Sequence, residues 1–385
     1  MKVYRIAVML NGSEYINYYE KLSNLWRMKE GLKANTNQAV LYYNLESSFV
    51  TYNSLFASFF SYFTGQAYEK LFETLYKDLV NKIITALYFN RIEKNGVVEI
   101  SLFGFGQGAT LARHFAVEYI EHRLKSSMLA DQGINIKLDA EYLFDSVRLH
   151  STSFVSRYFK AKPISYTSRI PMGTKAYHAL SLDDFDIIDE PLLIDQKVGG
   201  IEELWFSGDQ LDVGGGHMLP AHDSPPGSSD ALGYMVMRAR ENGLEFTDQF
   251  IQKLSEEKNS EVLSVIHNRN WFLPPAQRRV RAVYVQKDYS ISDEMPLIHE
   301  TAIRRMQVAK DPDYQPAALL PFTQLQVLTK DGRRVSARFV DKAVAPPLLT
   351  RFESEREANS DRLPKANPAK SETMVDVNSA KLKCR

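Results

Sequence analysis

The sequence lacks several features that would point directly to a class of function. It contains one cysteine, Cys384, so neither a disulfide framework nor a zinc site built from several cysteines can form. Lysine plus arginine (47) equals aspartate plus glutamate (47), and this balance provides no positive field to hold a polyanion. No apolar run approaches the roughly 20 residues that a membrane-spanning helix needs. We therefore expect neither nucleic-acid binding nor a membrane span.

The N-terminal segment MKVYRIAVML also falls short of a secretory signal. Its apolar run is too brief, and no small-residue cleavage site follows it. We expect a protein located in the cytoplasm of the producing cell, and any export would have to use a route that needs no signal peptide.

What the sequence does contain is an ordinary globular composition, with 44% hydrophobic and 24% charged residues. Short apolar or β-branched runs predict strands at residues 4–10, 39–43, 97–103, 134–144, 176–182 and 203–206. Apolar residues at helical spacing predict helices at 66–89, 107–124, 228–242 and 247–258. Strands that alternate with helices predict an α/β fold with a mostly parallel sheet and helices on both faces.

One segment, VVEISLFGFGQGATLAR at 97–113, combines a strand, a glycine-rich sharp turn and a helix. This is the layout of the nucleophile elbow G-x-S-x-G. Gly104 and Gly108 stand at the flanking glycine positions, but the central residue is Gly106. Because glycine has no hydroxyl group, no acyl-enzyme can form at this position. Glycine also relieves the strain that a serine bears at positive φ.

Two other interpretations of this turn stay open on the residues alone. GFGQGA is similar to the dinucleotide-binding pattern G-x-G-x-x-G, but the third glycine is absent and no Lys-Ser/Thr pair follows for a P-loop. The other interpretation is that the segment forms a plain tight turn without a functional role.

Further motifs, in order along residues 1 to about 320, carry a resemblance to a family. The chain resembles a bacterial and fungal family of uncharacterised α/β-hydrolases whose best-known branch is the type VI secretion phospholipase effectors. The similar blocks are Asn11-Gly12-Ser13, Gly104-Phe105-Gly106-Gln107-Gly108-Ala109, Phe144-Asp145-Ser146-Val147, His178-Ala179-Leu180-Ser181-Leu182-Asp183, and the run WFSGDQLDVGGG at 205–216.

The resemblance implies a catalytic triad of serine, aspartate and histidine, and two of its three members are replaced here. The nucleophile position is Gly106, the acid is Asp145 and the base position is Gln210. Glutamine does not take up a proton near neutral pH. In a serine protease, loss of the serine or the histidine alone costs on the order of 10⁶ in turnover. The resemblance therefore implies a degenerate site on a retained fold.

Other positions of the same blocks are candidates for binding. Gln107 and the Gly12–Ser13 turn could supply the backbone donors of an oxyanion hole, and Asp212 is a further candidate binding residue. The sequence gives no firm metal site, although Asp145, Asp209 and Asp212 are possible ligands of a hard cation. Such aspartates more often cap turns.

Some other residues are candidates for replacing the missing nucleophile or base. His178 is a possible substitute base, and the alternative is a structural histidine that hydrogen-bonds the neighbouring loop. Ser146, Ser207 and Thr110 offer hydroxyl groups near the elbow, but none of them occupies the turn itself.

These residues give two functional hypotheses. The first is a catalytically degenerate hydrolase that needs no cofactor and binds a lipid-like ligand, such as a phospholipid or membrane lipid, or a secretion-apparatus protein. The alternative is an active phospholipase or esterase with a rebuilt catalytic site. We predict one α/β-hydrolase-like domain with helical insertions over residues 1–350. The polar composition beyond that point predicts a disordered tail over 351–385.

Overall fold

The protein is built around one large twisted sheet. The computed structural model describes residues 3–12, 23–45, 66–93, 95–147, 169–184, 191–194, 200–216, 229–259, 283, 295–307, 316–322, 324–340 and 348–354. Its ten strands lie in the order β10-β9-β8-β7-β6-β5-β4-β3-β1-β2. The strands are β1 (Val3–Gly12), β2 (Gln38–Asn44), β3 (Val97–Gly106), β4 (Asn135–Phe144), β5 (Lys175–Ser181), β6 (Ile201–Phe206), β7 (Leu297–His299), β8 (Gln324–Leu328), β9 (Arg334–Val340) and β10 (Leu348–Ser354).

Most of the sheet is parallel, since every neighbouring pair of strands among β1 to β8 runs in the same direction. Antiparallel pairing occurs at one edge, where β9 lies between β8 and β10 and pairs with both. Parallel strands are buried on both faces and read as nearly continuous apolar runs. The buried run from Ile6 to Leu10 in β1 follows this rule. The predicted α/β class with a mostly parallel sheet is confirmed.

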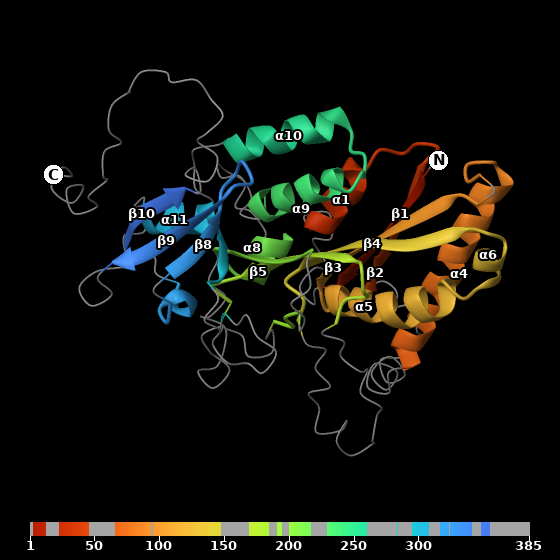
Figure 1. Cartoon of the computed structure of the whole chain (residues 1–385), viewed down its shortest axis with the longest axis horizontal. Coiled ribbons are helices and arrows are strands. Elements are labelled where there is room, and N and C mark those ends of the chain that lie inside the picture. The colour runs from red at the N-terminus through yellow and green to blue at the C-terminus, as the bar shows by residue number, and fades with distance from the viewer. Residues whose placement is uncertain are drawn as a thin grey trace, which may run out of the picture.

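Helices cover both faces of the sheet (Figure 1). One face carries α1 (Asn24–Gly31), α9 (Ser229–Glu241) and α10 (Asp248–Asn259). The other carries α4 (Gln66–Tyr88), α5 (Gln107–Phe115), the π-helix η2 (Ala116–Leu124) and the short α6 (Met128–Asp131). The remaining helices are α8 (Gln210–Gly214), α11 (Glu300–Gln307) and the 3₁₀ turn η5 (Ala317–Leu319). Each face therefore has its own apolar core, and a third cluster lies beneath α11.

Two predicted elements differ from the structure in detail. The helix predicted over 107–124 is α-helical only to Phe115, and it continues as a π-helix from Ala116. The predicted tail, 351–385, overlaps β10 by the residues 351–354. The rest of that tail lies outside the described residues.

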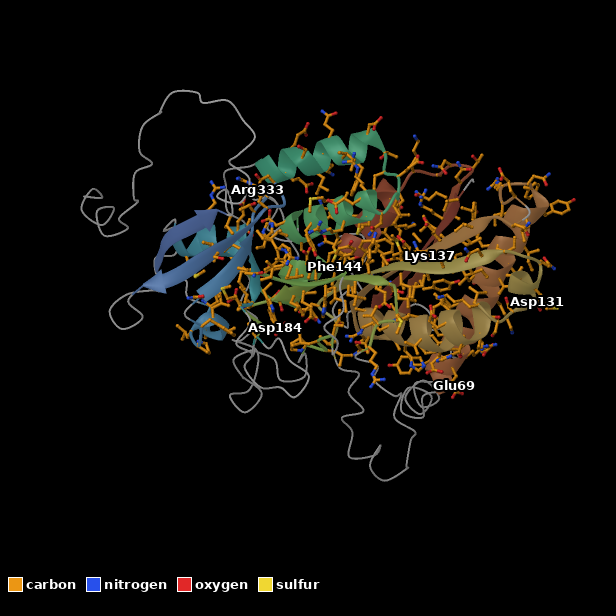
Figure 2. The ribbon with its side chains drawn as sticks, in the orientation of Figure 1. Glu69, Asp131, Lys137, Phe144, Asp184 and Arg333 are labelled. Carbon is orange, nitrogen blue, oxygen red and sulfur yellow. The ribbon has the colours of Figure 1, made fainter. Side chains whose placement is uncertain are left out.

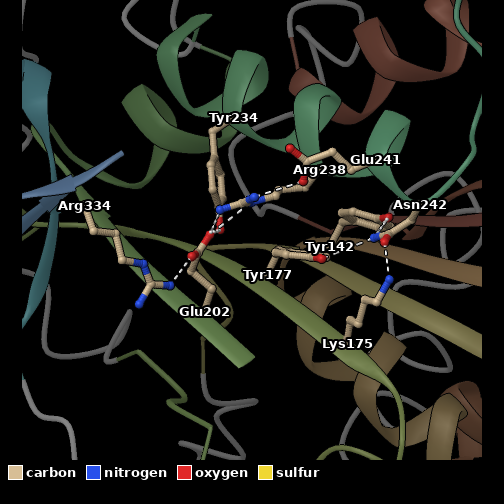
Figure 3. A network of polar contacts seen from close by, with 9 residues as sticks. All are labelled: Tyr142, Lys175, Tyr177, Glu202, Tyr234, Arg238, Glu241, Asn242 and Arg334. Atoms are coloured by element: carbon tan, nitrogen blue, oxygen red, sulfur yellow. Dashed lines mark hydrogen bonds and ion pairs between the residues drawn. The ribbon is translucent and has the colours of Figure 1, made fainter. Parts of the chain in front are cut away.

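A buried polar network ties α9 to the sheet (Figure 3). Glu202, in the second residue of β6, accepts hydrogen bonds from Tyr234 at 2.7 Å and from Arg238 at 2.7 and 3.0 Å, and it also pairs with Arg334 on β9. Burial raises the pKa of Glu202, but these donors and positive charges outweigh it and hold the pKa below its ordinary value. The network thus joins the antiparallel edge and α9 to the centre of the sheet.

The connectivity marks one end of the sheet as the place for a site. β1 lies between β2 and β3, so the chain runs to one side after β1 and later returns to the other. Ligands of open α/β sheets bind at such a switch point, outside the carboxyl ends of the strands. Figure 2 shows β4 running from Lys137 toward Phe144, with Asp184 beyond that end. We call this end of the sheet the carboxyl edge.

Candidate functional site

The predicted elbow is present as a sharp turn between β3 and α5. Gly106 caps the N-terminus of α5 with φ 57° and ψ −123°, a conformation that L-residues other than glycine rarely adopt. The flanking glycines are required by close packing: a Cβ on Gly104 would lie 2.6 Å from Ala109 N, and one on Gly108 would lie 2.8 Å from the carbonyl carbon of Leu10. The turn therefore has the strained geometry that presents a nucleophile in a hydrolase.

Gly106 faces the residue at the predicted base position. A Cβ on Gly106 would lie 3.5 Å from Nε2 of Gln210, and its nearest neighbour would be the carbonyl oxygen of Gly12 at 3.1 Å. Gln210 is 2% exposed, and its Nε2 has no hydrogen-bond partner among the described residues. The structure thus brings the nucleophile and base positions together, but the two residues hold neither a hydroxyl nor an imidazole.

The predicted oxyanion-hole residues lie at the same point. Gly12 ends β1 and pairs with Gly106 across the sheet, and Gln107 begins α5. A Cβ on Gly12 would lie 2.6 Å from Gly108 N, so the end of β1 packs directly on the first turn of α5. The first amides of a helix have no partner within the helix and carry partial positive charge. Ser13 lies outside the described residues.

Asp145 follows β4 at the carboxyl edge and is fully buried. Its φ of 39° is unusual for a residue other than glycine. Its Oδ1 accepts a hydrogen bond from Ser181 N at 3.0 Å, and its Oδ2 accepts one from Ser181 Oγ at 3.2 Å. These contacts orient the carboxylate toward the end of β5.

Asp183 and Asp184, in the loop after β5, accept hydrogen bonds from the loop after β6. Neither was predicted as a site residue. Oδ2 of Asp184 accepts from Gln210 N at 3.1 Å, and Oδ2 of Asp183 accepts from Gly208 N at 2.7 Å. The available signal was their position after β5, at the same edge as Asp145. Sequence pattern alone did not show that these loops meet.

The candidate binding residue Asp212 has a capping role in the structure. Asp209 and Asp212 form a capping box at the start of α8, in which each carboxylate accepts the other residue's backbone N–H at 3.0 Å. Among the described residues, no group of three or more His, Cys, Asp or Glu side chains could hold a metal ion.

His178 is the middle of a buried hydrogen-bond chain. Its Nε2 lies 2.9 Å from Ser146 Oγ and accepts from Ser146 N at 3.1 Å. Because Nε2 accepts from this amide, the ring proton resides on Nδ1, which lies 3.0 Å from Glu203 Oε1. Arg113 joins this hydrogen-bond chain, because its guanidinium donates to Ser146 Oγ and to the backbone carbonyl of Leu192. His178 thus hydrogen-bonds Ser146 in the loop that follows β4.

Glu141, on β4, is a second buried acid, and it lies within the electrostatic influence of Arg113. Both carboxylate oxygens of Glu141 are buried and have no partner among the described residues. Burial raises the pKa of Glu141 to about 8, although the positive charge of Arg113 lowers it in part. Glu141 therefore carries a proton in the folded protein at neutral pH.

The described carboxyl-edge segments carry charge of one sign. The segments 11–12, 106–110, 145–147, 181–184 and 207–216 contain five aspartates and no lysine or arginine. Two positive groups adjoin these segments: the N-terminal amides of α5, and Arg113, which reaches Ser146 beside Asp145. The centre formed by Gly106 and Gln210 is itself uncharged.

Comparison with known proteins gives only remote likenesses. No protein-family model and no curated protein matches the chain. An uncharacterized protein from Pseudomonas aeruginosa matches 66% of this chain and 48% of its own, at 14% identity and a TM-score of 0.38. The Tle1 effector, solved bound to the VgrG spike from the Type 6 secretion system, matches 57% of this chain and 52% of its own, at 15% identity and a TM-score of 0.39.

The chain therefore spans about half the length of these two solved structures, and at such scores neither assigns it an activity. No helix in the described part of the chain combines the length and apolarity that crossing a bilayer requires.

Proposed function

We propose that this chain is a catalytically degenerate α/β-hydrolase-like protein, similar to the type VI secretion phospholipase effectors, that binds a lipid-like ligand instead of hydrolysing it. The observation that supports this most directly is the pairing of Gly106 with Gln210. The elbow keeps the backbone conformation and close-packed glycines of a nucleophile turn, but neither facing residue can attack a carbonyl or take up the proton.

Turnover of a short-chain ester and of a phospholipid by the purified chain tests this proposal. We expect hydrolysis at the background rate. Hydrolysis well above background that disappears in Asp145→Ala would contradict the proposal, because Asp145 is the one triad position that keeps its residue.

The converse experiment restores both missing groups. A serine at 106 directs its side chain toward residue 210, since a Cβ there lies 3.5 Å from the present Gln210 Nε2. We expect the double variant Gly106→Ser/Gln210→His to hydrolyse the ester above background, and each single variant to stay near background. A folded but inactive double variant would show that the ligand pocket has been lost together with the triad.

A second candidate function is an active esterase with a rebuilt site, and the Ser146–His178–Glu203 chain is the observation that favours it. In that reaction Ser146 Oγ would attack the acyl carbonyl and pass its proton to His178 Nε2. His178 would then protonate the leaving alkoxide, and water would release the acid. Against it, Ser146 and His178 are fully buried, and Ser146 N already occupies the Nε2 lone pair.

Labelling with a fluorophosphonate probe separates the two candidates. An activated serine reacts covalently with this reagent, and mass spectrometry locates the adduct. We expect no adduct on the wild-type chain. An adduct on Ser146 that is lost in His178→Gln would establish the rebuilt site and refute the binding proposal.

We extend the proposal to export, on the motif resemblance alone. An effector-like protein would leave the producing cell by docking on a secretion-apparatus protein. Co-purification with a spike protein encoded next to this chain tests the idea, and absence of such a complex at micromolar concentrations of both proteins would count against it.

A further inference from the structure

A short segment between β5 and β6, residues 191–194, lies against the loop that follows β4, and we call it the strap. Pro191 forms an isolated antiparallel bridge with Val147. The backbone N–H of Leu192 donates to the carbonyl oxygen of Ser146 at 2.7 Å. Leu192 is only 5% exposed. The strap is therefore packed into this end of the sheet and held there by its backbone.

The strap also binds both ends of the hydrogen-bond chain that runs from Ser146 through His178 to Glu203. At one end, Ser146 Oγ donates to the carbonyl oxygen of Leu192 at 3.1 Å. At the other end, Ile194 N donates to Glu203 Oε1 at 2.9 Å. The same carboxylate oxygen lies 3.0 Å from His178 Nδ1. The strap thus covers a serine, a histidine and a glutamate that are already linked to one another.

Arg113, on α5, is a third anchor of the strap. Its guanidinium donates to the carbonyl oxygens of Leu192 and Leu193, the latter at 3.1 Å. The Leu192 carbonyl therefore accepts from a guanidinium and from the Ser146 hydroxyl at the same time. The carbonyl of an ester that is attacked by a serine needs donors of this kind around its oxygen. The strap peptide occupies the position that such a carbonyl would take.

The strap keeps the Ser146 hydroxyl from being activated by its histidine. Ser146 Oγ lies 2.9 Å from His178 Nε2 and 3.1 Å from the Leu192 carbonyl oxygen, and it has one proton to donate. His178 Nε2 already accepts from Ser146 N at 3.1 Å. The hydroxyl proton therefore goes to the strap. A serine whose proton is not taken by a base is a weak nucleophile.

We propose that the strap is an autoinhibitory contact over a latent acyl-transfer site, the hydrogen-bond chain centred on His178. Ser146 and His178 are fully buried, so an ester reaches them only when the strap moves away. Departure of Leu192 also frees the hydroxyl proton and the backbone carbonyl of Ser146, which the strap now holds. The inference goes beyond the proposed function, because this site uses neither Gly106 nor Gln210.

Covalent labelling of the full chain with a fluorophosphonate tests the proposal. In this reaction Ser146 Oγ forms a bond to phosphorus, fluoride leaves, and the serine proton passes to His178 Nε2. The opening of the strap is followed on the same samples by hydrogen exchange of the Leu192 and Ile194 amides, which are protected by their hydrogen bonds. We expect no adduct on the wild-type chain.

Two variants weaken the strap without changing the hydrogen-bond chain beneath it. Leu192→Ala removes a buried side chain, which should speed exchange of the strap amides by at least about thirtyfold and make Ser146 react. Pro191→Gly is milder and should speed exchange by about fivefold, because glycine gains more backbone freedom when the strap opens. The adduct should disappear when His178→Gln is added to Leu192→Ala.

Leu254→Ala is the matched control. Leu254 is also 5% exposed, but it lies on α10, which covers the opposite face of the sheet from α5 (Figure 1). This variant loses a comparable amount of buried surface, and the strap should stay closed and Ser146 unlabelled. Circular dichroism of each variant checks that it is folded, and Pro191→Gly carries the test if Leu192→Ala does not fold.

Faster exchange of the strap without an adduct on Ser146 would overturn the latent site. Unchanged exchange in both strap variants, or an equal yield of adduct in Leu254→Ala, would overturn the role of the strap. An adduct on the wild-type chain would overturn the autoinhibition and would refute the proposed function as well. An adduct that is confined to the strap variants supports the inference and leaves the proposed function of the wild-type chain standing.

Discussion

The buried acid Glu141 allows a quantitative test of the core. Burial raises its pKa from 4.5 to about 8, so the folded protein keeps a proton that the unfolded chain releases. The stability that depends on this proton is complete below pH 4.5 and is lost as the pH rises to about 8. One pKa unit corresponds to 1.36 kcal/mol, so the full loss is on the order of 5 kcal/mol.

The substitution Glu141→Gln removes the titration and keeps the shape of the neutral side chain. Urea unfolding of the wild type and the variant between pH 5 and pH 9 measures the effect. The free energies of unfolding should be similar at pH 5. The variant should gain about 1.4 kcal/mol per pH unit over the wild type above that, and the difference should level off beyond pH 8.

Glu118→Gln is the control, because Glu118 is exposed on η2 and offers no buried charge. The stability difference measured for this variant is subtracted from that of Glu141→Gln at each pH. A Glu141→Gln difference that stays constant from pH 5 to pH 9, or a variant less stable than the wild type at pH 8, would refute the reasoning about burial.

Three further predictions concern named side chains. Glu202→Gln should destabilise the protein by about 2 kcal/mol at pH 7 in urea unfolding. Because the folded pKa of Glu202 is lowered, the stability from its charge is present above the unfolded pKa, and this loss should vanish as the pH falls through the folded value. Gly104→Ala should cost about 3 kcal/mol by overpacking, more than the roughly 1–2 kcal/mol of backbone strain in Gly106→Ala, and equal costs would contradict the looser packing around Gly106. Ser146→Ala should cost about 1 kcal/mol in urea unfolding, because its hydroxyl bonds to His178 and to the carbonyl of Leu192, and a measurable ester turnover in the wild type that this variant abolishes would instead support the rebuilt site.

The central strands could be predicted because a strand that is buried on both faces has a nearly continuous apolar sequence. The six predicted strands all occur in the structure, with boundaries that differ by a few residues. The strands β7 to β10 were not predicted. β7 has only three residues, and β8 and β9 alternate polar and apolar residues next to charged turns, so that pairing with neighbours decides their conformation. The helix α1 was missed as well.

The contact between Gly106 and Gln210 could be predicted only from the order in which the motifs occur along the chain. Gly106 and Gln210 are 104 positions apart, and their contact depends on β1, β3 and β6 all ending at one edge. The chain from Ser146 through His178 to Glu203 depends on register, because His178 pairs with Glu203 on the neighbouring strand. No single sequence specifies register when strands are buried on both faces, since each position is apolar either way.

The two ends of the parallel strands carry different kinds of residues, and this matters for engineering. The network around Glu202 starts from the second residue of β6, whereas Gly106 ends β3, and Asp145 and Gln210 come after the ends of β4 and β6. Substitutions at separate sites that share no partners have nearly additive effects on stability. A library for new ester-cleaving sites at the carboxyl edge should therefore leave the Glu202 network intact, provided that it spares Gly12, Gly104 and Gly108, where a side chain would meet backbone atoms.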